Sequence, residues 1–116
     1  MAESKNLSSP EETRTFDKGK LEIVTVNGQQ VGRGTFEPGW KWSDCVKPIV
    51  GTDSCQVEHL GYVVSGRMHV QFDDGTVTEV GPGDFVHLPP GHDAWILGND
   101  TCVFVDLMGA PNYAKR

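Results

Sequence analysis

The chain has 116 residues, a net charge of −6 and an isoelectric point near 5.0. This length fits one domain with a sizeable core, and the acidic balance argues against nucleic acid or an anionic membrane as a partner. No apolar run approaches the length of a membrane span, and the N-terminal stretch "MAESKNLSSPEE" lacks the apolar segment of a secretory signal.

The cysteines point to a reducing setting. There are three of them, Cys45, Cys55 and Cys102, with no short spacing of the kind that metal-binding cysteine pairs show. An odd number without such pairs favours free thiols. We therefore expect a cytoplasmic protein.

The chain begins with a polar segment. Residues 1–15 contain "SSPEE" and few apolar side chains, which predicts a loose arm or a docked extension. We divide the chain into an N-terminal arm at 1–20, a barrel at 21–110 and a C-terminal tail at 111–116.

Short apolar runs follow the arm, and most of them alternate with period two. They are "KLEIVTV", "QVGRGTF", "HLGYVVSGRMHVQF", "TVTEV", "DFVHLP", "AWIL" and "TCVFVDLM". Such runs, rich in β-branched and aromatic residues, are typical of strands. Gly, Pro, Asn and Asp separate them, and the clearest hairpin turns at Asp73-Asp74-Gly75. No window shows helical periodicity over three turns. The pattern predicts an all-β sandwich or barrel.

Several of these segments, in this order, carry a family resemblance. They are "TFEPGW", "GYVVSGRMHVQF" and "DDGTVTEVGPGDFVHLPPG", spread over roughly residues 30–105. The chain resembles a small single-domain member of the cupin superfamily. The resemblance implies a cupin-type jelly-roll β-barrel.

The metal motif of that family is altered here. A cupin site usually has a His-x-His pair, a Glu and a distal His. Spacing from Gly66 places His59 at the Glu position, and spacing from Gly91 places Ala94 at the distal His position. The His-x-His pair is absent in either register. Counting from Gly39 places Cys45 and Lys47 at its two positions, and counting back from His59 places Asp53 and Cys55 there.

A different histidine lies close to the distal position. His92 precedes Ala94 by two residues, so both side chains point to the same face of a strand. We expect His92 to meet His59 inside the barrel, with Cys55, or Cys45 in the other register, as a thiolate. Two imidazoles and a thiolate suit a zinc-like ion better than iron. Asp53 or Asp93 could orient the imidazoles. The alternative is a metal-free pocket whose histidines hydrogen-bond a ligand.

Three further residues are candidates for ligand binding. Trp40 and Trp42 share a face and could form a flat wall at the barrel mouth, or simply fill the interior. Lys47 could bind a carboxylate or phosphate, or could lie at the surface.

The sequence leaves three functions open. The first is binding of a small organic molecule at a histidine site, with a weakly bound divalent metal or none. The second is an isomerase, dehydratase or decarboxylase with His59 and His92 as acid and base or as metal ligands. The third is a structural dimerisation module. We expect a homodimer, and the resemblance implies that residues 1–26 could cover a partner's sheet edge.

Overall fold

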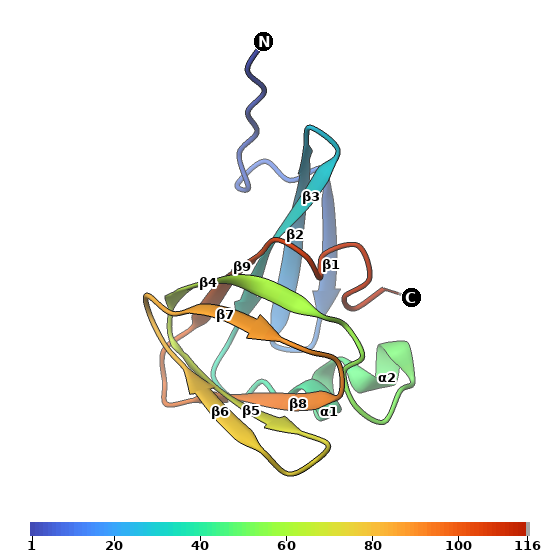
Figure 1. Cartoon of the computed structure of the whole chain (residues 1–116), viewed down its shortest axis with the longest axis vertical. Helices are drawn as coiled ribbons and strands as arrows, with labels where there is room; N and C mark the ends of the chain where they lie inside the picture. Colours follow the sequence, from blue (N-terminus) through green and yellow to red (C-terminus); the bar gives the residue numbers. More distant parts are fainter. Residues whose placement is uncertain (116) are drawn as a thin grey trace.

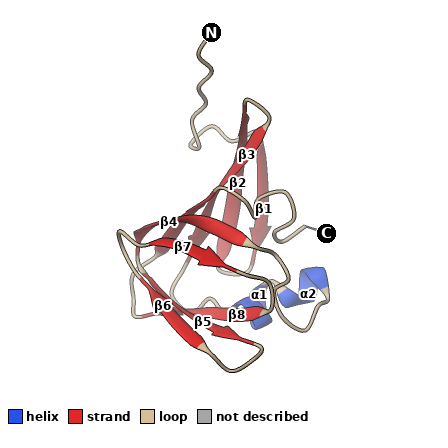
Figure 2. Ribbon diagram, in the orientation of Figure 1, coloured by secondary structure: helices blue, strands red, loops and turns tan. Residues whose placement is uncertain are grey.

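The computed structural model describes residues 1–115, which form two facing antiparallel sheets. The larger sheet has the order β1-β2-β3-β9-β4-β7 and the smaller one the order β6-β5-β8. Figures 1 and 2 show the smaller sheet facing β4 and β7, while β1, β2 and β3 extend beyond the barrel. The strands are β1 (Glu12–Phe16), β2 (Gly19–Val26), β3 (Gln29–Phe36), β4 (His59–Ser65), β5 (Arg67–Phe72), β6 (Val77–Val80), β7 (Phe85–Leu88), β8 (His92–Leu97) and β9 (Cys102–Asp106).

The strands from β2 to β9 arise where the alternation predicted them, which confirms the all-β, jelly-roll fold, whereas β1 lies in the segment predicted to be an arm. In β8 the burial alternates along the strand, with His92, Ala94 and Ile96 buried and the residues between them half-buried. The predicted hairpin is also present, because β5 and β6 pair in antiparallel register around Asp73-Asp74-Gly75. Alternating apolar side chains thus fill the space between the two sheets.

One long predicted strand divides at Gly66, where the chain passes from β4 in one sheet to β5 in the other. Gly66 has a φ of 76°, and a Cβ there would lie 2.5 Å from Cys102 Cα. Only glycine tolerates both the positive φ and this close approach.

Two single-turn helices were not expected from the sequence. They are α1 (Trp42–Cys45) and α2 (Lys47–Val50), and they lie beside β8 (Figure 1). Proline near the start of α2 and Gly51 in the left-handed conformation after it delimit the second turn. Each helix is too short to produce helical periodicity in the sequence.

Segments near both ends of the chain form part of the fold. The segment assigned to the arm contains β1, which pairs with β2 along its whole length. In the segment assigned to the tail, Tyr113 and Ala114 are buried and belong to the core. The interior therefore draws on residues from outside the 21–110 range.

Candidate functional site

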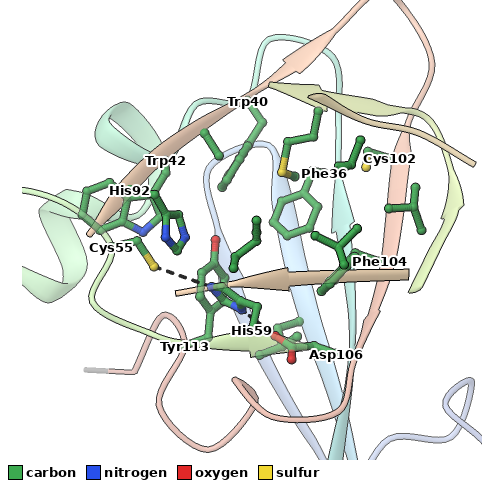
Figure 3. Close-up of a pocket in the computed structure, with 18 residues that line it drawn as sticks. Phe36, Trp40, Trp42, Cys55, His59, His92, Cys102, Phe104, Asp106 and Tyr113 are labelled. Atoms are coloured by element: carbon green, nitrogen blue, oxygen red, sulfur yellow. Dashed lines mark hydrogen bonds and ion pairs between the residues drawn. The ribbon is translucent and has the colours of Figure 1, made fainter. Parts of the chain in front are cut away.

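A cavity of about 50 Å³ lies between the sheets. Its walls are mainly apolar, and its polar side chains gather toward one side, where His59, His92, Cys55, Asp106 and Tyr113 meet (Figure 3). The volume accommodates only a molecule of a few heavy atoms.

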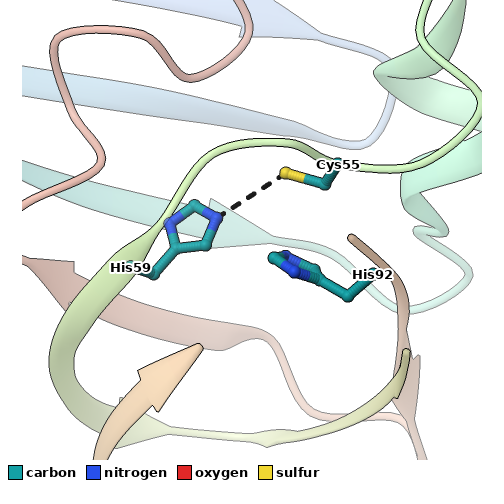
Figure 4. Close-up of side chains that lie close together, drawn as sticks. All are labelled: Cys55, His59 and His92. Atoms are coloured by element: carbon teal, nitrogen blue, oxygen red, sulfur yellow. Dashed lines mark hydrogen bonds between the residues drawn. The ribbon is translucent and has the colours of Figure 1, made fainter. Parts of the chain in front are cut away.

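The two histidines predicted to converge do so, and Cys55 joins them (Figure 4). The imidazole centroids of His59 and His92 are 5.4 Å apart. Cys55 Sγ lies 3.7 Å from His59 Nε2, and one ligand atom from each residue falls within 4.8 Å of the others. Cys55 reaches this position because its backbone pairs with that of His92, with N–O distances of 2.7 and 3.2 Å.

A buried carboxylate orients His59. His59 Nδ1 donates a hydrogen bond to Asp106 Oδ2 at 2.6 Å. The other oxygen, Oδ1, accepts from the backbone N–H groups of Met108 at 3.0 Å and Gly109 at 2.8 Å. A Cβ on Gly109 would lie 2.6 Å from His59 Nδ1. The absence of a side chain there lets the turn after β9 close tightly over the His59–Asp106 pair.

His92 is oriented by the backbone. Its Nδ1 donates to the carbonyl oxygen of Pro89 at 2.9 Å. Because a carbonyl only accepts, Nδ1 must carry the proton, and Nε2 is the nitrogen that remains available to the site. Both histidines thus use Nδ1 for an oxygen acceptor outside the group.

The contacts shift the pKa values of the buried groups. Burial by itself lowers the pKa of His59, but the hydrogen bonds to Asp106 and Cys55 outweigh it and raise the value to about 9. Burial raises the pKa of Cys55, but the hydrogen bonds to His59 and His92 reverse this and lower it to about 6. The two groups titrate as a coupled pair, and a thiolate–imidazolium form is favoured near neutral pH.

Asp106 and Tyr113 are site residues that the sequence reasoning missed. Asp106 continues the inward alternation of Cys102 and Phe104, and a lone carboxylate on an inward face was a usable signal. The Tyr113 ring packs edge-on against His59, with centroids 5.4 Å apart. Burial, followed by the charges of Cys55, Asp106 and Cys45, raises the pKa of Tyr113 well above its ordinary value. No sequence signal placed Tyr113 here.

Three side chains also form the boundary between the cavity and the outside. Trp42, Cys55 and Tyr113 line both the cavity and a second pocket of about 190 Å³. That pocket extends outward between α2 and the C-terminal segment 112–115.

The predicted orienting carboxylates are wrong. Asp53 is fully exposed on its side chain, and Asp93 Oδ1 accepts from the backbone N–H groups of Ser43 and Ala94. Asp106 and the carbonyl of Pro89 take their place. The thiolate alternative, Cys45, lies outside the Cys55–His59–His92 group, with its Sγ 3.9 Å from Asp17 Oδ2.

The other predicted ligand-binding residues, Trp40, Trp42 and Lys47, do not line an open mouth of the barrel. Trp40 and Trp42 share an inward face, as predicted, but each is only 2% exposed and forms part of the interior wall. The predicted flat wall at a barrel mouth is therefore wrong. Lys47 does not line the cavity, and its half-exposed side chain lies 3.9 Å from Asp53.

Comparisons with known proteins agree with this architecture. Residues 53–108 match the family model of the cupin domain. No curated protein matches the chain by sequence. Together with the two-sheet barrel, the match supports the cupin-type fold that the sequence predicted.

Several solved structures share the fold at low sequence identity. A protein of unknown function from Acinetobacter sp. ADP1 has 12% identity and a TM-score of 0.60, over 84% of this chain and 90% of that one. A cupin-like protein from Thermotoga maritima has 18% identity and a TM-score of 0.55, over 80% and 70%. KdgF from Halomonas sp. has 23% identity and a TM-score of 0.54, over 79% of each chain. These similarities show the fold alone.

Proposed function

We propose that this protein binds a small organic molecule in its barrel cavity, at a centre where Cys55, His59 and His92 hold one zinc-like divalent ion. One observation carries the proposal. The Nδ1–H of each imidazole donates to an oxygen, that of Asp106 for His59 and that of Pro89 for His92. Both Nε2 atoms therefore remain available to bind an ion beside Cys55. Imidazoles that bind metals are typically oriented in this way.

The donor set suits zinc better than iron. Two imidazole nitrogens and a thiolate are ligands that zinc accepts, whereas iron and manganese sites rely on carboxylate oxygens. The carboxylate nearest the group, Asp106, is already committed to His59 and to two backbone N–H groups.

The distances require only a small adjustment. Tetrahedral zinc holds a sulfur and a nitrogen ligand roughly 3.5 Å apart, and Cys55 Sγ already lies 3.7 Å from His59 Nε2. The ligand atoms of the group lie within 4.8 Å of one another, so the widest pair would close by up to about 1.5 Å. Such an ion, when bound, supplies a fourth position for water or for an acceptor atom of the ligand.

Elemental analysis of protein purified without an affinity tag tests this centre. We expect about one zinc per chain, lost in Cys55→Ser, His59→Gln and His92→Gln, because each variant removes one ligand. Cys45→Ser, His69→Gln and His87→Gln are matched controls, since those residues lie outside the group. Sub-stoichiometric zinc after incubation with excess zinc, or equal loss in the controls, would contradict the proposal.

A second function is favoured by the series of Cys55, His59 and Asp106. A thiol, an imidazole and a buried carboxylate follow one another at 3.7 and 2.6 Å, as in enzymes that use an activated cysteine. In this function the Cys55 S–H bond breaks and its proton passes to His59 Nε2. The sulfur then adds to a carbonyl carbon of the substrate, and the π electrons of that carbonyl move to its oxygen. It would make the protein an enzyme rather than a binding module.

Alkylation of the metal-free protein tests this second function. Iodoacetamide should modify Cys55 at pH 7 faster than Cys45 or Cys102, as read by mass spectrometry of peptides, and Asp106→Asn should slow the reaction at Cys55. Modification of all three cysteines at equal rates would argue against it.

The homodimer and the cytoplasmic setting stay predictions.

A further inference from the structure

Two hydrogen-bond donors of the cavity wall have no acceptor within residues 1–115. One is the indole N–H of Trp40, whose nitrogen is fully buried and unpaired. The other is the hydroxyl of Tyr113, which no hydrogen bond of the described residues engages and which is directed into the cavity (Figure 3). Buried polar groups are normally paired. A ligand that supplies an acceptor would pair the buried indole N–H of Trp40, and Tyr113 lies on the wall of the same cavity.

The Tyr113 ring is held firmly in place. Its backbone N–H donates to Gly109 O at 3.1 Å, and its carbonyl accepts from Arg14 Nη1 at 2.9 Å. Its ring packs edge-on against Phe16 and Phe36, at 6.0 and 6.5 Å between centroids. Because the backbone and these aromatic contacts fix the ring, the hydroxyl is pre-positioned, so a ligand meets it at little entropic cost.

Trp40 belongs to the same aromatic group. Its ring lies 4.5 Å from Phe36 and 6.4 Å from Phe16. Its backbone is already satisfied, because its N–H donates to Glu37 O and its carbonyl accepts from Ile96 N. The indole N–H is therefore the one polar group of Trp40 left for a ligand, and leaving it buried without a partner is costly.

We propose that the cavity binds a small carboxylic acid, whose oxygens accept hydrogen bonds from Tyr113 and Trp40. An indole N–H only donates, so the ligand must supply an acceptor, and an ionised carboxylate supplies two oxygens that only accept. Hydrogen bonds to an ionised acceptor are the stronger kind. The apolar walls suit a short hydrocarbon remainder, and a cavity of about 50 Å³ limits its length.

This inference rests on the proposed function only for the place where the molecule binds. The two donors lie outside the Cys55–His59–His92 group. The acid can therefore bind whether or not an ion is present.

Titration with propionate tests the inference, with propionamide as the neutral ligand of the same shape. In proton–nitrogen correlation spectra of the metal-free protein, propionate should shift the indole signal of Trp40, assigned with Trp40→Phe, and leave that of Trp95 in place. Tyr113→Phe should weaken propionate binding roughly tenfold or more, since it removes a hydrogen bond to a charged group. Tyr62→Phe is the matched control, because Tyr62 is 44% exposed and does not line the cavity.

Several results would overturn the inference: no saturable binding of propionate, propionamide binding as tightly as propionate, an unchanged Trp40 indole signal, or equal affinity in Tyr113→Phe and the wild type. If Tyr113→Phe fails to fold in a thermal melt, the indole shift and the propionamide comparison in the wild type decide. Repeating the titration after zinc incubation separates the two proposals. Absence of zinc with intact propionate binding removes the metal centre alone, and the reverse result removes the acid alone.

Discussion

Two cysteines line the same cavity in different surroundings, and their comparison shows what lowers the pKa of a buried thiol here. Cys102 on β9 is 1% exposed and Cys55 is 2% exposed. Burial alone raises the pKa of Cys102 to about 11. At Cys55 burial acts in the same direction, but the hydrogen bonds to His59 and His92 lower the pKa to about 6. Position inside the barrel therefore does not activate a thiol, whereas the two imidazoles do.

The largest expected effect is the separation of the two thiol titrations. In the metal-free Cys45→Ala variant, the ultraviolet absorbance of thiolate should show one thiol ionising near pH 6, and Cys102 should stay protonated up to about pH 11. Two thiols that ionise together near pH 9 would abolish the contrast.

The next effect concerns the carboxylate behind His59. Asp106→Asn removes one partner of a buried pair and should cost roughly 3 kcal/mol of unfolding free energy, measured by urea denaturation. Asp84→Asn is the matched control: that carboxylate accepts from Gly81 N at 2.8 Å in an exposed turn, so its loss should cost about 1 kcal/mol or less. Equal costs would mean that Asp106 only caps a turn.

A smaller effect appears in the pH dependence of stability. His59 has its pKa raised from 6.5 to about 9, so its stabilising contribution is complete below pH 6.5 and is lost as the pH rises through 9. Cys55 has its pKa lowered from 9.0 to about 6, so its contribution is present above pH 9 and is lost as the pH falls through 6. In the metal-free wild type the two trends oppose each other between pH 6 and 9, and stability should be nearly flat there.

The Cys55→Ser variant isolates the pH dependence of stability that His59 contributes. Because Asp106 still raises the pKa of His59, this variant should lose stability from pH 6.5 to 9, by about 1–2 kcal/mol, since one pKa unit corresponds to about 1.4 kcal/mol. Urea titrations at four or five pH values measure it, with Cys102→Ser as the control that keeps the flat profile. A flat profile in Cys55→Ser would show that the two groups do not titrate as a pair.

The smallest effect is expected at Lys47. Lys47→Ala should change the unfolding free energy by less than about 0.5 kcal/mol and leave zinc and propionate binding unchanged, because the side chain is half-exposed and does not line the cavity. Reduced propionate affinity in this variant would restore Lys47 as a ligand-binding residue.

The strand pattern and part of the site could be predicted because they depend on local chemistry. Period-two alternation locates β8, and it places His92 on the same inward face as Ala94. Motif spacing from Gly66 placed His59 at a ligand position on β4. Cys55 and Cys45 were both possible thiol ligands, because the irregular segment before β4 has no alternation that fixes its alignment with the family motif.

The two residues that complete the site could not be predicted from local patterns. Asp106 lies 47 positions from His59, and their contact depends on the antiparallel register of β4 with β9, in which Gly61 faces Asp106. Tyr113 reaches the cavity only because Arg14 on β1 and the Asp106 turn fold the C-terminal segment back over His59.

The amino-acid sequence by itself determined the strands, the turns and the inward histidines, since each follows from the backbone geometry of a few neighbouring residues. Tertiary structure alone decided which thiol, carboxylate and hydroxyl join them. Those neighbours come from separate segments of the chain and from a returning terminus, and only the packing of the two sheets gathers them around the imidazoles.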